Sequence, residues 1–189
     1  MQRDLHLTLA ELEAALSAES PSPEDNGTVE MIVRRPADDE REVLEEGHFD
    51  PADGLVGDNW RTRGSRRMPD GRAHPDRQIT LMNARVAEIV ARGRSRWPLA
   101  GDQLFVDLDL SPENLPPGTR LAIGESAVLE VTAEAHTGCH KFSDRFGPDA
   151  LVFVNSPDGR ARQRRGIYAK VTRPGLVRNG EKIRKLTNA

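Results

Sequence analysis

The chain has 189 residues, of which 30% are charged and only 4% aromatic, and its formal net charge is -3. This length suits one domain with an extension, and no apolar run approaches the roughly 20 residues that span a bilayer, so we expect no membrane association. One cysteine excludes an internal disulfide and a multi-cysteine metal centre, and the N-terminus lacks a signal-peptide pattern, which together indicate a reducing, cytoplasmic compartment.

Charge is distributed unevenly along the chain. Residues 1–58 hold sixteen Asp or Glu against four Lys or Arg, whereas residues 160–185 hold ten Lys or Arg against one Glu. Such a basic end attracts an anionic ligand or nucleic acid, or else it neutralises the acidic end across the fold. Tyr168 is the only aromatic residue in the basic stretch, so this stretch lacks the aromatic side chains on which bases stack. We therefore expect no nucleic-acid partner.

The chain begins with a predicted amphipathic helix over residues 4–19. One face carries leucines at helical spacing, namely Leu5, Leu9, Leu12 and Leu16. Thr8 and Glu11 have the spacing of a capping box, and the Ser- and Pro-containing segment 20–27 ends the helix. We therefore assign residues 1–27 to a peripheral helix and linker, packed on the main domain or on a second copy, and residues 28–189 to the main domain.

The main domain opens with a predicted strand over residues 28–34, which Pro36 closes. Residues 40–49 are compatible both with strand and with a short helix. Residues 54–60 predict a tight loop with two glycines, in which Asp58 orders the backbone as an Asx-turn.

Residues 61–77 hold six arginines and few apolar residues, and they predict a long loop. A loop of this length in a compact domain is usually functional or disordered. Asn83 is a predicted N-cap for a helix over residues 84–92 that ends at Gly93, and residues 97–102 predict a turn. Short segments with strand-like alternation make up most of the remainder: residues 78–82, 103–108, 120–123, 127–133, 165–171, 176–178 and 182–186.

Turn signals join these strands at close intervals. Gly124 with Glu125 predicts one hairpin, Asn179 with Gly180 predicts another, and residues 157–159 predict a strong turn. Residues 150–155 are compatible with a strand or a helix. Many short strands and few helices predict a mainly β protein, a closed or nearly closed and mostly antiparallel barrel with a few peripheral helices.

The single cysteine, Cys139, follows the strand predicted over residues 127–133 and precedes a loop or single helical turn at residues 143–147. Four basic side chains lie within six residues of it: His136, His140, Lys141 and Arg145. Such cations favour the thiolate, which is both the nucleophilic form of cysteine and a soft metal ligand. The alternative is equally open, because unpaired cysteines often only fill space in the core.

Several segments occur in an order that resembles the MOSC domain, which is also found at the C-terminus of molybdenum cofactor sulfurase. They are residues 54–58 (GLVGD), 101–102 (GD), 115–124 (LPPGTRLAIG), 138–139 (GC), 165–171 (RGIYAKV) and 175–183 (GLVRNGEKI). The resemblance covers roughly residues 28–186 and implies a mixed β-barrel.

The resemblance also implies a role for Cys139. It matches the family cysteine, which is proposed to carry sulfur or to ligate molybdenum in the pterin cofactor, and members of known activity use that cofactor to reduce N-hydroxylated compounds. The family also has an association with pyridoxal phosphate binding. The implied cofactor here is the molybdenum cofactor, and the implied metal ligand is Cys139.

The terminal phosphate of such a pterin needs cationic or amide partners. The candidates for cofactor binding are Arg145, Arg164, Arg165, Lys141, Asn155, Arg72 and Arg77. His136 and His140 flank the thiol and are candidates for proton donation alongside Cys139, although either also fits an ordinary loop histidine. Asn155 alternatively caps the turn that follows it.

Three functions remain open from the sequence. The first is a molybdenum-cofactor enzyme acting on a small molecule with a redox partner. The second is a sulfur carrier that passes a persulfide on Cys139 between a donor and an acceptor protein. The third is a non-catalytic barrel that binds another anion. The sequence leaves the oligomeric state open, with a homodimer as one option.

Overall fold

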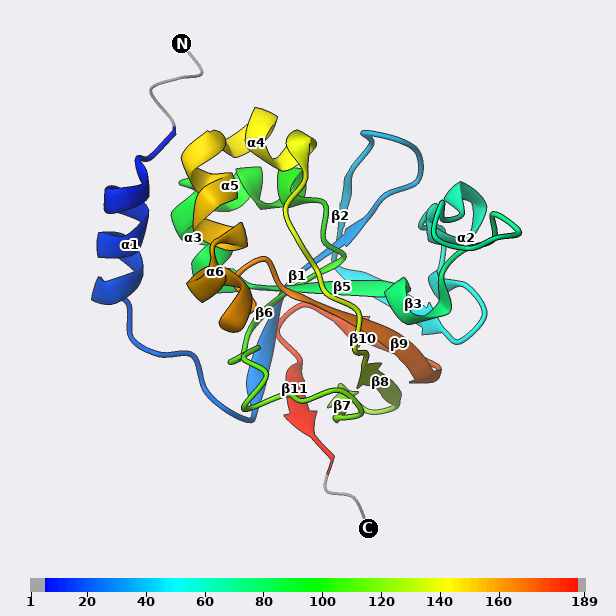
Figure 1. Cartoon of the computed structure of the whole chain (residues 1–189). Helices are drawn as coiled ribbons and strands as arrows, with labels where there is room; N and C mark the ends of the chain where they lie inside the picture. Colours follow the sequence, from blue (N-terminus) through cyan, green and yellow to red (C-terminus); the bar gives the residue numbers. More distant parts are fainter. Residues whose placement is uncertain (1–5, 187–189) are drawn as a thin grey trace.

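Within residues 6–186, the part of the chain that the structure describes, seven strands close into a mixed β-barrel (Figure 1). The structure is a computed structural model. The strands follow the order β11-β7-β8-β9-β5-β6-β1, and pairing of β11 with β1 closes the barrel. β5 and β6 pair in parallel, and the other neighbours are antiparallel. The strands are β1 (Gly27–Arg34), β5 (Ile79–Asn83), β6 (Leu104–Asp107), β7 (Arg120–Ile123), β8 (Ala127–Val131), β9 (Ile167–Arg173) and β11 (Lys182–Lys185). The predicted mixed barrel is confirmed.

Alternating side chains fill the barrel interior, as the strand periodicity predicts. On β1, for example, Val29 and Ile32 are fully buried and pack in one apolar cluster with Leu104, Leu129 and Ile183. A bulge between Val29 and Met31 in the pairing with β6 shifts the alternation along β1. This core holds the strand ends, and therefore the loops between them, in fixed positions.

A second, three-stranded sheet packs beside the barrel and corrects one prediction. It has the order β10-β3-β4, with β3 (Glu46–Asp50), β4 (Gly54–Leu55) and β10 (Gly175–Arg178), while β2 (Glu42–Leu44) pairs with β1. The Asn179–Gly180 hairpin is therefore wrong, because β10 pairs with β3 while β11 joins the barrel. The turn donates its backbone N–H groups to Glu45 and Val29 instead. The ambiguous segment 40–49 contains strands.

Helices cover one side of the barrel and form a second apolar core with it (Figure 1). They are α1 (Leu9–Ala18), α3 (Ala84–Ala91), α4 (His140–Phe146), α5 (Pro148–Asn155), α6 (Pro157–Ala161) and the 3-10 helix η3 (Arg94–Ala100). The turn predicted at residues 157–159 is instead the start of α6, where Ser156 caps the backbone and Pro157 occupies the first turn. Among the described residues, no helix is long and apolar enough to cross a membrane.

The long loop of residues 61–77 lies to the right of the barrel in Figure 1, far from α1. It begins in the short helix α2 (Trp60–Arg63) and ends in the 3-10 helix η2 (Pro75–Arg77), and the segment between them is irregular. The indole N–H of Trp60 donates to the His74 carbonyl at 3.3 Å, which ties the two ends of the loop together.

α1 begins at Leu9, five residues later than predicted, because Thr8 is its N-cap. Thr8 and Glu11 form the predicted capping box, in which the Thr8 N–H donates to the Glu11 carboxylate at 2.7 Å. Residues 4 and 5 of the predicted helix lie outside the described residues. The helix packs on α5 and α3, on the outer face of the helical layer.

Replacing Leu12 by Ala should lower the free energy of unfolding by about 2–3 kcal/mol. Leu12 is 1% exposed and is the fully buried side chain of α1, so the substitution opens a cavity between α1 and the helical layer. Urea denaturation measures the change, with Ala14→Ser on the exposed side of the same helix as the control. Equal stabilities of the two variants would show that α1 is not packed on the domain.

Candidate functional site: a cation-lined pocket beside Cys139

Cys139 lies on the surface, where the segment after β8 turns into α4. It occupies the N-cap position of α4, its backbone is extended, and its side chain is exposed. The Asn155 side-chain amide forms two hydrogen bonds with the backbone of the preceding residue, Gly138. It accepts from the Gly138 N–H at 2.9 Å and donates to the Gly138 carbonyl at 3.0 Å. A Cβ at Gly138 would lie 2.7 Å from Leu151, so glycine lets the cysteine loop pass close over α5. Asn155, predicted to bind a cofactor, holds this loop in place.

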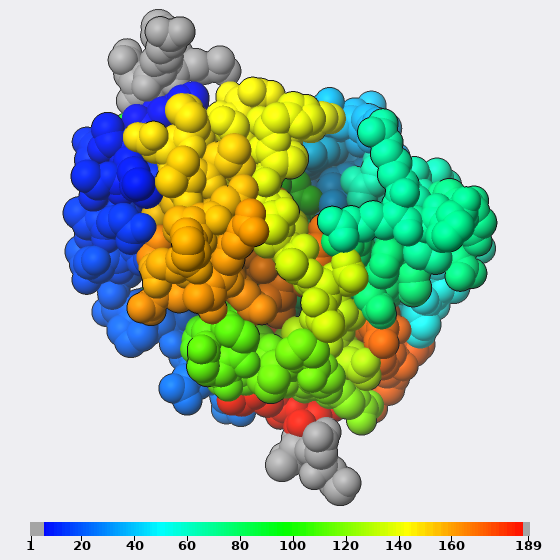
Figure 2. All heavy atoms as spheres, viewed as in Figure 1, coloured from blue at the N-terminus to red at the C-terminus, as the bar shows by residue number. Residues whose placement is uncertain are grey.

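A pocket of about 150 Å³ opens beside Cys139. Figure 2 shows the surface hollowed between the yellow segment that carries Cys139 and the blue-green segment on the right that contains α2. The walls come from five regions: the loop between β1 and β2, α2 with its N-cap, the end of η3, α4 with its N-cap, and the segment before β9. Six cationic residues line it: Arg35, Arg41, Arg63, Lys141, Arg145 and Arg165. A pocket with a cationic lining therefore opens beside the exposed thiol.

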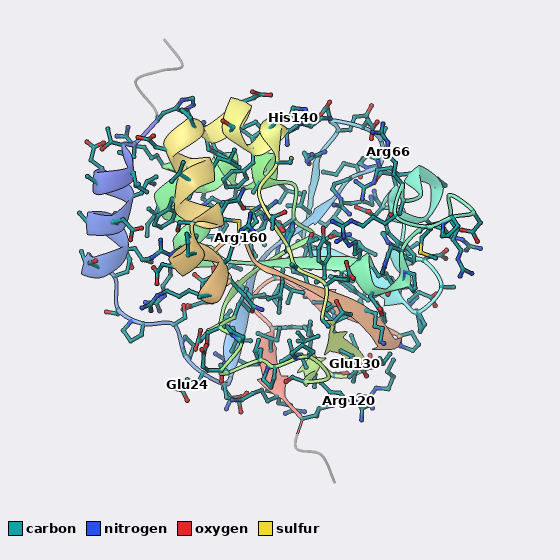
Figure 3. All side chains as sticks on the ribbon, in the orientation of Figure 1. Glu24, Arg66, Arg120, Glu130, His140 and Arg160 are labelled. Atoms are coloured by element: carbon teal, nitrogen blue, oxygen red, sulfur yellow. The ribbon has the colours of Figure 1, made fainter. Side chains whose placement is uncertain are left out.

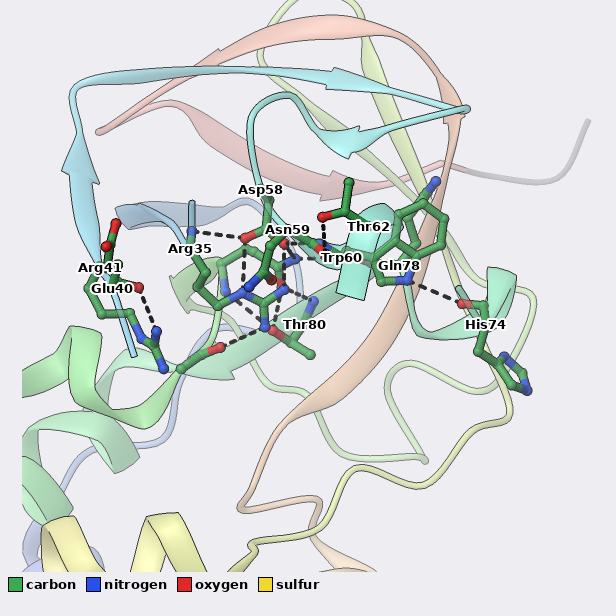
Figure 4. Close-up of polar contacts among 12 residues, drawn as sticks. Arg35, Glu40, Arg41, Asp58, Asn59, Trp60, Thr62, His74, Gln78 and Thr80 are labelled. Atoms are coloured by element: carbon green, nitrogen blue, oxygen red, sulfur yellow. Dashed lines mark hydrogen bonds and ion pairs between the residues drawn. The ribbon is translucent and has the colours of Figure 1, made fainter. Parts of the chain in front are cut away.

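Arg35 is held in the pocket wall by a buried carboxylate (Figure 4). The Arg35 guanidinium donates to both carboxylate oxygens of Asp58 at 2.8 and 2.9 Å, and to the Gly101 carbonyl at 3.0 Å. Asp58 also accepts from the backbone N–H of Arg35 and from that of Trp60, each at 2.9 Å. The contact with Trp60 is the predicted Asx-type turn. The ion pair with Arg35 is the additional feature that spans two loops.

Arg165 is fixed in the same manner from the other side of the pocket. Its guanidinium donates to the Asp102 carboxylate at 2.7 Å and to the Ala100 carbonyl at 2.8 Å, and it stacks over the Phe142 ring. Asp102 is fully buried. Asp58 and Asp102 belong to the two Gly-Asp segments of the sequence. They have equivalent roles, because each forms an ion pair with one arginine of the pocket wall.

The rim of the pocket carries positive charge that its acids do not balance. Arg145 and Lys141 contact the Asp39 carboxylate at 2.6 and 3.0 Å. Among the described residues, neither Arg41 nor Arg63 contacts a carboxylate. The pKa values of Arg41 and Arg63 are lowered, first by partial burial and next by neighbouring arginines, namely Arg145 and Arg35 for Arg41 and Arg35 for Arg63. Cations crowded in this way favour an anionic ligand.

His136 does not line the pocket but lies behind Arg165. Its side chain is 7% exposed and packs at a tilt against the Tyr168 ring, with 4.5 Å between the centroids. Its Nδ1 lies 3.7 Å from Asp102 Oδ1, and neither atom has a hydrogen-bond partner among the described residues. Burial, and then the nearby Arg165, hold the pKa of His136 well below its usual range. This side chain is therefore neutral and enclosed, and it does not flank the thiol as expected.

The stability of the fold should depend on pH through His136. Because the folded pKa is depressed, the unfolded chain binds the extra proton, and stability is lost as pH falls below about 6.5. Between pH 6.5 and pH 5 this loss amounts to at most about 2 kcal/mol. A His136→Phe variant keeps the ring packing and should lack this component. Urea denaturation of both proteins at pH 7.5 and pH 5 measures it, and parallel losses in the two proteins would exclude it.

The other predicted site residues lie outside the pocket. His140 is exposed at the start of α4 (Figure 3). Arg164 is buried under α1, where it pairs with Glu13 and Asp158 and stacks over the Phe153 ring. Arg72 pairs with Asp70 at 3.2 Å, and Arg77 pairs with Glu134 at 2.6 Å and lies over the Tyr168 ring. Of the predicted set, Cys139, Lys141, Arg145 and Arg165 come together in the pocket.

The sequence did not single out Arg35, Arg41, Arg63 or Asn59, which also line the pocket. Arg35 and Arg41 lie at the two ends of the loop between β1 and β2. Asn59 is the N-cap of α2, and Arg63 is the last residue of that helix. The one available signal was the position of Arg35 at the end of the first predicted strand, directly before Pro36.

The sequence matches the MOSC domain over residues 69–184. The chain belongs to the MOSC domain family. No curated protein matches it significantly. Solved structures with the MOSC fold include the YuaD protein from Bacillus subtilis, with a TM-score of 0.65 and 19% identity, over 87% of this chain and 97% of that chain. YiiM from Escherichia coli has a TM-score of 0.55 and 18% identity, over 86% of this chain and 71% of that chain. These likenesses show the MOSC fold, and the family is associated with the molybdenum cofactor.

Proposed function

We propose that this MOSC protein binds the molybdenum cofactor in the pocket, with Cys139 as the protein ligand to molybdenum, and reduces N-hydroxylated compounds. The observation that carries the proposal is the exposed thiol of Cys139 in the wall of a pocket lined by five arginines and a lysine. A soft sulfur donor and a set of phosphate-binding cations are the two features that this cofactor needs.

The donor set of the chain fits such a cofactor. Within residues 6–186, the structure has no group of three or more His, Cys, Asp or Glu side chains placed to hold a metal ion. A single thiolate from Cys139 suits a metal that arrives with its remaining ligands already bound. The pocket, at about 150 Å³, is smaller than the roughly 300–1,000 Å³ of typical ligand sites, so it accommodates one end of the cofactor.

Each residue of the pocket would have a separate role in holding the cofactor. Cys139 would hold the metal, and the bound cofactor would supply the two-electron chemistry of the reduction. Arg41 and Arg63, which have no carboxylate partner among the described residues, would bind the phosphate. Arg35 and Arg165 would keep the wall rigid, because Asp58 and Asp102 fix their guanidinium groups. Asn155 would set the position of the thiol through Gly138.

The same exposed thiol favours a second function, that of a sulfur carrier. Cys139 is accessible to a donor or acceptor protein, and Lys141 and Arg145 lie on the same pocket wall, where positive charge stabilises a persulfide anion. In this case the partner is another protein, and the chain is a delivery module.

Metal analysis separates the two functions. The protein is purified from a host that makes the molybdenum cofactor, and its molybdenum and pterin contents are measured. Near-stoichiometric molybdenum with pterin, and reduction of an N-hydroxylated amidine with an artificial electron donor, support the first function. Absence of both, with an added sulfur atom on Cys139 that a thiol reductant removes, supports the second. Absence of all three signals overturns both.

A further inference from the structure

The loop between β1 and β2 places a carboxylate of the protein against two pocket cations. Asp39 contacts the Lys141 ammonium through both carboxylate oxygens at 3.0 Å and the Arg145 guanidinium at 2.6 Å. These contacts join residues more than 100 positions apart in sequence, and all three residues line the pocket. The Asp39 side chain is 59% exposed, so solvent screens both ion pairs.

An unpartnered amide lies on the opposite wall. Asn59 is 8% exposed and lines the pocket, and its side-chain Oδ1 has no hydrogen-bond partner among the described residues (Figure 4). Buried polar atoms of native proteins nearly always have a partner, which can be a bound ligand or water. A hydroxyl on a ligand would satisfy this oxygen. A half-turn of the amide would present its N–H groups to a ligand oxygen instead.

We propose that the pocket binds a compact, phosphate-like oxyanion between Asn59, Arg41 and Arg63, and that Asp39 is an internal competitor that the oxyanion displaces from Lys141 and Arg145. The proposal rests on the proposed function for the location of the site, and it adds Asn59 as a binding residue and Asp39 as the residue that tunes the affinity. The oxyanion belongs either to a phosphomonoester or to free inorganic phosphate.

The charges in the pocket explain why displacement is favourable. Exposed ion pairs such as those of Asp39 contribute little net stability, so Lys141 and Arg145 exchange one anion for another with little loss. A dianion gains these two cations in addition to Arg41 and Arg63. Substitution of Asp39 by Asn removes the competing charge and leaves Lys141 and Arg145 without this carboxylate partner.

The test is calorimetric titration of the metal-free protein, at low ionic strength, with inorganic phosphate and separately with phenyl phosphate. Asp39→Asn should bind about 5–10-fold more tightly than wild type, and Arg63→Gln about tenfold more weakly. Asp38→Asn is the matched control for charge, because Asp38 lines the same pocket but forms no ion pair among the described residues. Its gain in affinity should be smaller than that of Asp39→Asn, because Lys141 and Arg145 stay paired with Asp39.

Arg61→Gln is the second control. Arg61 lies on α2 with Arg63, but it is exposed, pairs with Asp53 and does not line the pocket, so its loss should leave affinity unchanged. Binding of either probe supports the proposal, and the tighter probe identifies the source of the oxyanion. The proposal is overturned if no probe binds, if Asp39→Asn does not bind more tightly, or if Asp38→Asn gains as much as Asp39→Asn.

The proposed function can fail separately from this proposal. Phosphate binding by a protein that retains no molybdenum would contradict the proposed function and support the oxyanion site. Molybdenum retention without phosphate or phenyl phosphate binding would contradict the oxyanion site alone.

Discussion

Replacement of Asp58 by Ala is expected to lower the free energy of unfolding by about 3–5 kcal/mol. Asp58 is the carboxylate that neutralises Arg35, and the two side chains are only 0% and 8% exposed. Without it, Arg35 becomes a buried charge with no carboxylate partner, and the backbone N–H groups of Arg35 and Trp60 lose their acceptor. Urea denaturation at pH 7 measures the loss.

The neighbouring Asp53→Ala variant is the control. Asp53 pairs with Arg61 at 2.6 Å, but these side chains are 45% and 65% exposed, so its loss should change stability by less than about 1 kcal/mol. A double variant, Asp58→Leu with Arg35→Met, should recover part of the stability, because it removes the unpaired charge together with its partner. A loss below about 1 kcal/mol in Asp58→Ala would mean that Arg35 is not held as the structure shows.

Local periodicity predicted the barrel because each strand carries its own signal. The alternation of residues 127–133 and the Gly124 turn correspond to β8 and its hairpin with β7. The hairpin predicted at Asn179–Gly180 was wrong because a turn sequence specifies only that the chain reverses direction. Which strand pairs with which depends on where the free backbone groups find partners, and those of β10 find them on β3, about 130 residues away.

The helix α5 shows a different limit. Residues 150–155 include the run Leu151–Val154, whose length and β-branched valines suit a strand as well as a helix. In the fold, Phe153 and Val154 are buried against the helical layer, whereas Val152 is 48% exposed. The helix is decided by this packing and by the flanking residues, with Pro148 in its first turn.

The thiol could be placed from the sequence, but its surroundings could not. Lys141 and Arg145 follow Cys139 on α4, so their proximity was visible locally. Arg35 and Asn59 reach the pocket only because the barrel brings the loop after β1 and the start of α2 opposite α4. The prediction that His136 flanks the thiol was wrong. This residue precedes α4 on an extended segment, and its side chain turns inward to Tyr168 and Asp102.

Replacement of Cys139 by Ser is expected to reduce the molybdenum retained by the purified protein by about tenfold or more. Serine is close to cysteine in size, but its oxygen is a harder donor than thiolate sulfur and does not supply the soft ligand. The same substitution should abolish persulfide formation, since no sulfur remains to carry the added atom. Metal analysis and intact-mass measurement of protein from a cofactor-competent host report both effects.

The fold of the Cys139→Ser protein should be intact, with a melting temperature within about 2 °C of wild type, because the side chain is exposed and little packing is lost. His140→Ala is the matched control: it is the adjacent residue, it is exposed, and it does not line the pocket, so its molybdenum content should stay at the wild-type level. If Cys139→Ser fails to fold, the thiol is a packing residue. If it folds and retains both molybdenum and pterin as wild type does, the pocket cations hold the cofactor without sulfur ligation, and Cys139 is not the metal ligand.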